Sequence, residues 1–122
     1  VYKRQEVSIE TIPGITSFQA AAAATNTTLV EGEESLLLLS GVQGGDKLRE
    51  MSSRVDNVVF LKAYKNISDI CQALDENSRL ETAVGVVRCG FPDQEVFKDV
   101  KELCSQEPRY WTLIISKPGQ EK

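Results

Sequence analysis

The sequence predicts an α/β fold, a single three-layer domain in which helices cover both faces of a mixed sheet of about five strands. Two observations lead to this prediction. Short apolar runs of strand length alternate with helical segments along nearly the whole chain, and no internal repeat or low-complexity segment interrupts them. The chain has 122 residues, of which 41% are hydrophobic, and this is enough for one compact domain with its own core.

The first elements are a strand and a helix joined by a tight turn. Residues 6–12, EVSIETI, alternate apolar or small side chains with polar ones, as a strand does. Pro13–Gly14 ends this strand, because proline cannot donate a hydrogen bond to a neighbouring strand. The alanine-rich helix that follows begins with a capping box, in which Thr16 is the N-cap and Gln19 lies three residues on. Asn26 is expected to end the helix in a left-handed conformation.

Four further apolar runs, each bounded by turn residues, predict the remaining strands. The runs SLLLLSG and TAVGVVRC have the continuous apolar character of strands that are buried on both faces. In order along the chain, the predicted strands cover residues 35–41, 57–64, 82–89 and 110–116.

Three helices are expected between these strands. The first is short, is capped by Asp46 and follows the glycine-rich loop 41–45, which lacks the Lys-Ser/Thr pair of a phosphate-binding loop and is therefore read as a turn. The second has apolar residues at the spacing of one helix face, namely Ile67, Ile70, Cys71 and Leu74. The third has an apolar face made of Val96, Val100, Leu103 and Cys104.

Charge and hydropathy exclude several classes of partner. The formal net charge is -4 and the pI is near 4.9, with lysines and arginines scattered among the acidic residues. This balance argues against a nucleic-acid groove or a basic membrane-binding patch. No apolar run has the length needed to span a bilayer, and no signal peptide is visible, so we expect no membrane or nucleic-acid partner.

The cysteine and histidine content limits the chemistry. Cys71, Cys89 and Cys104 form an odd set without CxxC spacing, which favours reduced thiols in a cytoplasmic protein. The chain has no histidine, which excludes Ser-His-Asp and Cys-His arrangements and makes a metal site unexpected. Any chemistry must therefore depend on positioning and electrostatics.

Small or polar residues stand where three predicted elements meet a turn, and these ends could converge on one crevice. Each position also has a structural interpretation: helix capping alone at the first, a lysine that extends from an edge strand to solvent at the second, and an ordinary turn glycine at the third. The candidate residues are Thr16 and Ser17, Lys62 and Ala63, and Gly90.

The order and spacing of several segments carry a family resemblance. The segments are IPGITSFQAAAAA, LVEGEESLLLLSG, VVFLKAYKNISDI, VGVVRCGFPDQEVFKDVKEL and PRYWTLIISKP. Together they resemble the C-terminal half of the tetrapyrrole (corrin/porphyrin) methylases, from about Val7 to Lys117. The acidic EGEESL turn, the lysine of VVFLKAY and the aromatic YWTLIISK ending favour the subfamily that methylates carbon 20 of precorrin-2 or cobalt-factor II in cobalamin biosynthesis.

The resemblance implies a cofactor and its contacts. Enzymes of this family bind S-adenosylmethionine in a cleft between two α/β domains. An electron-rich meso carbon of the tetrapyrrole substrate attacks the cofactor's methyl group and displaces the sulfur, so that S-adenosyl homocysteine leaves. Thr16 and Ser17 match the family's PGITS/A contact with the cofactor. Lys62, with Ala63 beside it, lies where many relatives have a methionine next to the adenosine, and Gly90 matches a glycine that contacts the cofactor through its backbone.

The resemblance also implies a missing part. The N-terminal domain with its GxGPGDP loop does not occur in this sequence, so residues 6–117 are expected to be the C-terminal domain of a longer enzyme and to be inactive alone. Residues 1–5 are interpreted as a cloning or reading-frame remnant and residues 118–122 as a frayed tail. The expected partners are the missing domain, a tetrapyrrole and, as the family suggests, a second copy of the enzyme.

Two other functions stay open. The chain could be a stand-alone α/β binding or dimerisation module that has kept the fold and lost the chemistry. It could also be a methylase of the same superfamily with another substrate, such as ribosomal RNA or diphthine. The mild negative charge and the segments typical of carbon-20 enzymes argue against the second alternative.

Overall fold

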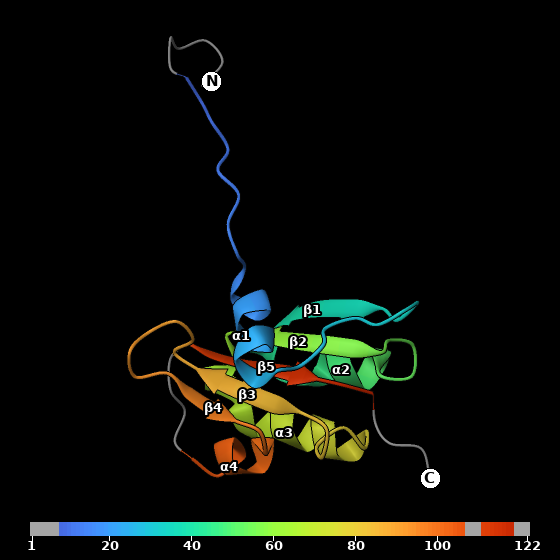
Figure 1. The fold of residues 1–122 in the computed structure, drawn as a ribbon. Helices are drawn as coiled ribbons and strands as arrows, with labels where there is room; N and C mark the ends of the chain where they lie inside the picture. Colours follow the sequence, from blue (N-terminus) through green and yellow to red (C-terminus); the bar gives the residue numbers. More distant parts are fainter. Residues whose placement is uncertain (1–7, 107–110, 119–122) are drawn as a thin grey trace.

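The computed structural model describes residues 8–106 and 111–118, and three of its four described helices lie between strands along the chain, while the first precedes every described strand (Figure 1). The described strands are β1 (Leu36–Ser40), β2 (Asn57–Leu61), β3 (Val84–Val87), β4 (Glu95–Phe97) and β5 (Thr112–Ser116). The described helices are α1 (Ser17–Thr25), α2 (Asp46–Met51), α3 (Ile67–Glu76) and α4 (Val100–Cys104), with 3-10 turns η2 (Gly41–Gln43) and η3 (Ala63–Asn66). Within these ranges, no helix has both the length and the apolar character that crossing a membrane requires.

The strands form one mixed sheet in the order β1-β2-β5-β3-β4. β1 and β2 are parallel, whereas the β2–β5, β5–β3 and β3–β4 pairs are antiparallel. The carboxyl ends of β1, β2 and β3 therefore lie at the same edge of the sheet as the beginning of β5. We call this edge the ligand edge, because the candidate site described below lies there.

Helix α1 covers one face of the sheet, and its ends are those that the sequence predicts (Figure 1). The Gln19 N–H donates to Thr16 Oγ1 at 3.2 Å, while Gln19 Oε1 accepts from the Thr16 N–H at 3.1 Å. Asn26 adopts the left-handed conformation with φ 56° and ends the helix. Ala21 and Ala22 are buried against strand residues, because a methyl side chain lets the helix axis approach the sheet closely.

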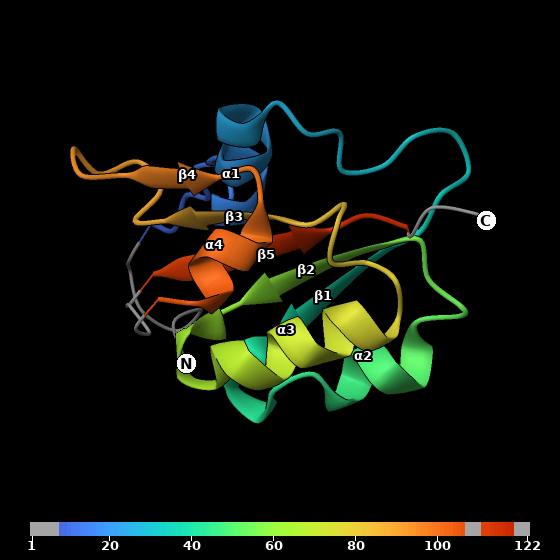
Figure 2. The same ribbon diagram turned by 90° about the horizontal axis from the view of Figure 1, so that it is seen from below.

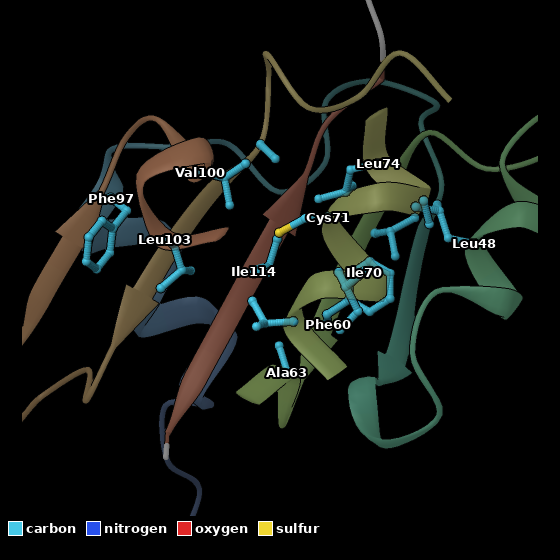
Figure 3. Packing of buried hydrophobic residues seen from close by; sticks show 14 of the residues in the cluster. Leu48, Phe60, Ala63, Ile70, Cys71, Leu74, Phe97, Val100, Leu103 and Ile114 are labelled. Carbon is cyan, nitrogen blue, oxygen red and sulfur yellow. The ribbon is translucent and has the colours of Figure 1, made fainter. Parts of the chain in front are cut away.

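Helices α2, α3 and α4 cover the opposite face, so the three-layer prediction is confirmed (Figure 2). The face of α3 predicted from its spacing is buried and packs on Phe60 of β2 and Ile114 of β5 (Figure 3). This cluster is the larger of the two cores and includes Leu48, Val58, Ile67, Ile70, Leu74, Val87, Val100 and Leu103.

Four secondary-structure predictions are wrong. Gly45 is the N-cap of α2 and Asp46 lies inside the helix as its first residue, so Asp46 does not cap it. Residues 8–12 form no strand and extend away from the domain (Figure 1), while residues 6–7 lie outside the described residues. β1 is an edge strand with Leu38 45% exposed, so it is not buried on both faces. Val96 belongs to β4, where it pairs with Val86, and α4 begins only at Val100. Apolar residues four positions apart suit one helix face and alternate strand positions equally, and pairing with β3 decides between them.

The prediction that the cysteines are reduced thiols is wrong for two of the three. Cys71 of α3 and Cys104 of α4 form a disulfide, with their Cα atoms 6.2 Å apart. Cys89 is a free thiol. The two paired cysteines are 33 residues apart, and only the packing of α3 beside α4 brings them together. Spacing motifs such as CxxC cannot reveal a contact of this kind.

One buried arginine holds together the end of the sheet opposite the ligand edge. Arg79 is 3% exposed and donates hydrogen bonds to four backbone carbonyl oxygens and two hydroxyl oxygens. These acceptors lie before β2 and at the end of β5, in Ser52, Val55, Asp56, Ser116 and Lys117. Burial lowers the pKa of Arg79, and the surrounding oxygens offset the cost of removing its charge from water.

Candidate functional site

A pocket of about 470 Å³ opens at the ligand edge of the sheet. Its lining residues come from the start of α1, the ends of β2 and β3, the turn after β2 and the beginning of β5. They are Ser17, Leu61, Lys62, Tyr64, Cys89, Trp111, Thr112 and Leu113. Residues as far apart in sequence as Ser17 and Leu113 meet here because the mixed topology brings these chain ends to one edge.

The backbone around this pocket is conformationally strained. Five non-glycine residues of the described chain have positive φ angles, and three of them, Lys62, Arg88 and Trp111, follow or precede strands at the ligand edge. The left-handed region is unfavourable for residues with a long or bulky side chain, and such outliers occur most often at functional sites. The Arg88 N–H donates to the Trp111 carbonyl oxygen at 3.0 Å, one step beyond the last paired residues of β3 and β5.

The structure separates the five predicted site residues into two groups. Ser17 and Lys62 line the pocket, so the predicted meeting of the α1 start with the β2 end is observed. The Thr16 hydroxyl accepts from the Gln19 N–H as part of the helix cap. Ala63 is fully buried in the core cluster and does not line the pocket.

Gly90 lies in the turn after β3 and is not one of the lining residues. Its φ is 88°, and its N–H donates to Gln94 Oε1 at 2.8 Å. A Cβ atom on Gly90 would meet no heavy atom within 4 Å, so the space around this glycine is open. The left-handed backbone by itself is sufficient to explain a glycine here.

Sequence reasoning missed Cys89 and Trp111, which also line the pocket. Both stood within predicted strands, and no motif marks the left-handed turn that places Trp111 at the pocket. Burial raises the pKa of the Cys89 thiol, so at neutral pH it is protonated and is a poor nucleophile. The aromatic pair YW at the start of the last predicted strand was the one available signal for Trp111.

The pocket is suited to binding and positioning a small molecule. Its wall is mostly apolar, with few polar groups, as is typical of small-molecule sites. Ser17 is the first residue of α1, where unpaired N–H groups and the positive end of the helix favour an anionic group. Lys62 adds an ammonium group, and no carboxylate lines the pocket. In the described part of the chain, no cluster of three or more His, Cys, Asp or Glu residues could hold a metal ion.

The fold and the pocket define an α/β domain with a pocket at the edge of a mixed sheet that is suited to a small molecule. Residues 1–104 match the family Tetrapyrrole (Corrin/Porphyrin) Methylases, and the chain belongs to this family. The family expected from the sequence is thus confirmed.

Curated relatives include carbon-20 methyltransferases. The precorrin-2 C(20)-methyltransferase of Sinorhizobium sp is 28% identical over 107 residues, which cover 88% of this chain and 43% of the relative. The probable cobalt-precorrin-2 C(20)-methyltransferase of Methanocaldococcus jannaschii is 35% identical over 95 residues, which cover 77% of this chain and 39% of the relative. The chain therefore spans less than half the length of these two relatives.

Solved structures show the same fold. A cobalt precorrin-4 methyltransferase superposes with a TM-score of 0.72 at 22% identity, covering 94% of this chain and 54% of that one. The uroporphyrin-III C-methyl transferase of Thermus thermophilus, complexed with S-adenosyl homocysteine, has a TM-score of 0.61 at 23% identity and covers 95% of this chain and 55% of that one. At these identities the similarity establishes the fold and leaves the chemistry to be argued from the site.

Proposed function

We propose that residues 6–117 are the C-terminal domain of an S-adenosylmethionine-dependent methyltransferase that methylates carbon 20 of precorrin-2 or cobalt-factor II in cobalamin biosynthesis. Family membership and the carbon-20 relatives support the reaction class and its substrate. The observation that carries the proposal is the pocket at the ligand edge, where the α1 start and the β2 end meet as the family resemblance implies.

The residues present fit S-adenosylmethionine chemically. Its carboxylate suits the start of α1 at Ser17 and the Lys62 ammonium group. Its adenine ring suits the apolar part of the wall formed by Leu61 and Leu113. Thr16, Ala63 and Gly90, which do not line the pocket, remain proposed cofactor contacts.

The proposed reaction needs alignment more than acid–base catalysis. When bound, S-adenosylmethionine would supply a methyl group on a positively charged sulfur, which a nucleophilic carbon can attack while S-adenosyl homocysteine leaves. The chain's own contribution is to hold the donor in one orientation and to keep water away with an apolar wall. The protonated Cys89 and the absence of histidine from the chain are compatible with a reaction in which this chain supplies no general base.

Catalysis is proposed to require a second domain as well. The relatives are more than twice as long as the region they share with this chain, so more than half of each relative has no counterpart here. We propose that a domain equivalent to that other half completes the cofactor site and binds the tetrapyrrole. From the family resemblance, we further propose that the whole enzyme is a cytoplasmic homodimer, whose mass light scattering would measure.

The test is methyl transfer by the intact protein encoded by the gene that contains this chain. It is incubated with isotopically labelled S-adenosylmethionine and either precorrin-2 or cobalt-factor II. Mass spectrometry then detects the added methyl group, and NMR locates it. The expected product carries the label at carbon 20. Labelling at another carbon would favour a relative with another substrate, and cofactor binding with no transfer to either tetrapyrrole would contradict the proposed reaction.

A matched pair of lysine variants tests the site. Lys62→Glu places a negative charge in the pocket wall, and we expect the affinity for S-adenosyl homocysteine to fall about tenfold or more. Lys65→Glu makes the same change on an exposed residue that does not line the pocket, so affinity is expected to stay within about twofold. Isothermal titration calorimetry measures both. Equal effects of the two variants would contradict a local role for Lys62.

A further inference from the structure

An aromatic pair stands exposed at the mouth of the pocket. Trp111 lines the pocket, yet 63% of its surface is exposed, and Phe91, in the loop between β3 and β4, is 41% exposed. Their ring centroids are 5.7 Å apart with an angle of 54° between the planes. The Arg88 guanidinium lies 4.6 Å from the centroid of Phe91 and pairs with Asp93 at 2.8 Å, which supports the Phe91 ring from behind.

The fold keeps Trp111 in this place at a conformational cost. Its φ is 65°, an unusual angle for a residue with so bulky a side chain. The hydrogen bond from the Arg88 N–H to the Trp111 carbonyl holds it there, and Arg88 is itself left-handed with φ 56°. A turn alone would be served better by glycine or asparagine. Strain of this kind persists where a side chain has a function that needs its direction.

The position of the pair indicates which ligand it contacts. A methyl donor bound in the pocket must meet its acceptor at the pocket mouth, since the transferred carbon bonds to both in the transition state. Trp111 borders this mouth and Phe91 packs against it, and large exposed rings bury their apolar faces when a flat ligand packs on them. Stacking also suits the adenine of the donor, and the affinity for S-adenosyl homocysteine distinguishes this alternative from the acceptor.

We propose that Trp111, supported by Phe91, is the platform on which the flat conjugated ring of the methyl acceptor packs. This inference rests on the proposed function and adds a residue that determines affinity for the acceptor. In this proposal the residues of the ligand edge have two different roles. Ser17 and Lys62 bind the methyl donor, and Trp111 binds and orients the acceptor.

The experiment compares two affinities in the intact protein. Trp111→Gly removes the ring and relaxes the left-handed backbone, whereas Trp111→Tyr keeps an aromatic face. The dissociation constant for cobalt-factor II is measured by absorbance titration, and that for S-adenosyl homocysteine by calorimetry. Trp111→Gly is expected to weaken cobalt-factor II binding about tenfold and to leave S-adenosyl homocysteine binding within about twofold. Trp111→Tyr is expected to restore most of the lost affinity.

Val96→Ala serves as the matched control, since Val96 is an exposed apolar residue of β4 outside the pocket. Thermal unfolding of each variant shows that it is folded, and Trp111→Asn, which also tolerates positive φ, replaces the glycine variant if that one is not. A loss of affinity for S-adenosyl homocysteine alone would overturn the inference and assign the platform to the adenine. No change in either affinity would also overturn it. A wild-type protein that methylates no tetrapyrrole would refute the proposed function itself, a different result.

Discussion

The two ends of the sheet are built on opposite principles. At the end where β2 begins and β5 finishes, the buried Arg79 donates to six oxygen atoms and leaves a densely hydrogen-bonded joint. At the ligand edge, Lys62, Arg88 and Trp111 have left-handed backbones, and aromatic rings stand exposed around a pocket. The Arg79 end gains stability because its buried arginine is fully hydrogen-bonded. The ligand edge keeps a strained backbone, and such strain occurs most often where residues bind a ligand.

The difference teaches that stability and binding are separated in this small domain. A change at the Arg79 end should act on the free energy of unfolding and reach the pocket only if the domain unfolds. A change at the ligand edge should act on binding and can even stabilise the fold, because strained functional positions are rarely optimal for stability. The following predictions test this separation.

The largest expected effect is that of Arg79→Met. It leaves four carbonyl and two hydroxyl oxygens without their buried donor, so the free energy of unfolding should fall by about 3–4 kcal/mol. Urea unfolding followed by circular dichroism measures it. Arg54→Met, at an exposed arginine just before β2, should change stability by less than about 0.5 kcal/mol. If Arg79→Met lowers the free energy of unfolding by less than about 1 kcal/mol, the hydrogen bonds of Arg79 are not important for stability.

Reduction of the Cys71–Cys104 disulfide should have the next largest effect. The bond joins residues 33 apart, and its loss should lower the free energy of unfolding by about 3 kcal/mol. Urea unfolding with and without dithiothreitol measures this loss, and Cys89→Ser should show the same difference because Cys89 is not in the bond. Affinity for S-adenosyl homocysteine should not change below the unfolding transition, since neither paired cysteine lines the pocket. If reduction also lowered the affinity for S-adenosyl homocysteine, the packing of α3 and α4 would affect the pocket, and stability and binding would not be separate.

Lys62→Gly should separate stability from binding most clearly. Lys62 has a left-handed backbone, which costs a non-glycine residue about 1–2 kcal/mol, and glycine removes this cost. Glycine also makes the unfolded chain more flexible, which offsets about half of the stability gained. The free energy of unfolding should therefore rise by about 0.5–1 kcal/mol, whereas affinity for S-adenosyl homocysteine should fall. Lys65→Gly, within η3, should lower stability instead. If Lys62→Gly also lowers stability, the strain argument is wrong.

The smallest effect concerns acid stability at the surface of α2 and α3. Hydrogen bonds from Arg49 lower the pKa of Asp69 and of Glu76 below their ordinary values of 3.8 and 4.5. Carboxylates with a depressed pKa stabilise the folded state at neutral pH, and this contribution is lost as pH falls through the folded-state pKa. Arg49→Met should thus flatten the decline of the urea midpoint below about pH 5. The effect is small because both carboxylates are partly exposed to water.

The comparison variant for this titration is again Arg54→Met, which should keep the wild-type dependence on pH. An Arg49→Met profile that runs parallel to the wild-type profile would contradict the assigned role of Arg49. Raised salt should reduce the difference between the two profiles, because exposed ion pairs are screened.

Local signals predicted the local structure well. The Thr16–Gln19 capping box and the Asn26 terminator act within one or two helical turns, and both are present. The buried face of α3 follows from its spacing in the same way. The strand predicted at residues 6–12 illustrates the limit: alternation specifies which face of a strand is apolar but supplies no neighbour, and residues 8–12 have none in the described sheet.

The sequence alone determined the fold class, both ends of α1, four of the strand positions, the family, and two residues of the pocket wall, Ser17 and Lys62. Only the tertiary structure decided that Trp111 and Cys89 complete the wall, that Cys71 meets Cys104 and that Val96 lies in a strand. The physical reason is the distance along the chain between the residues that interact. Capping and periodicity involve neighbours along the chain, whereas left-handed turns at strand ends, disulfides and strand pairing depend on partners that only the packed sheet brings together.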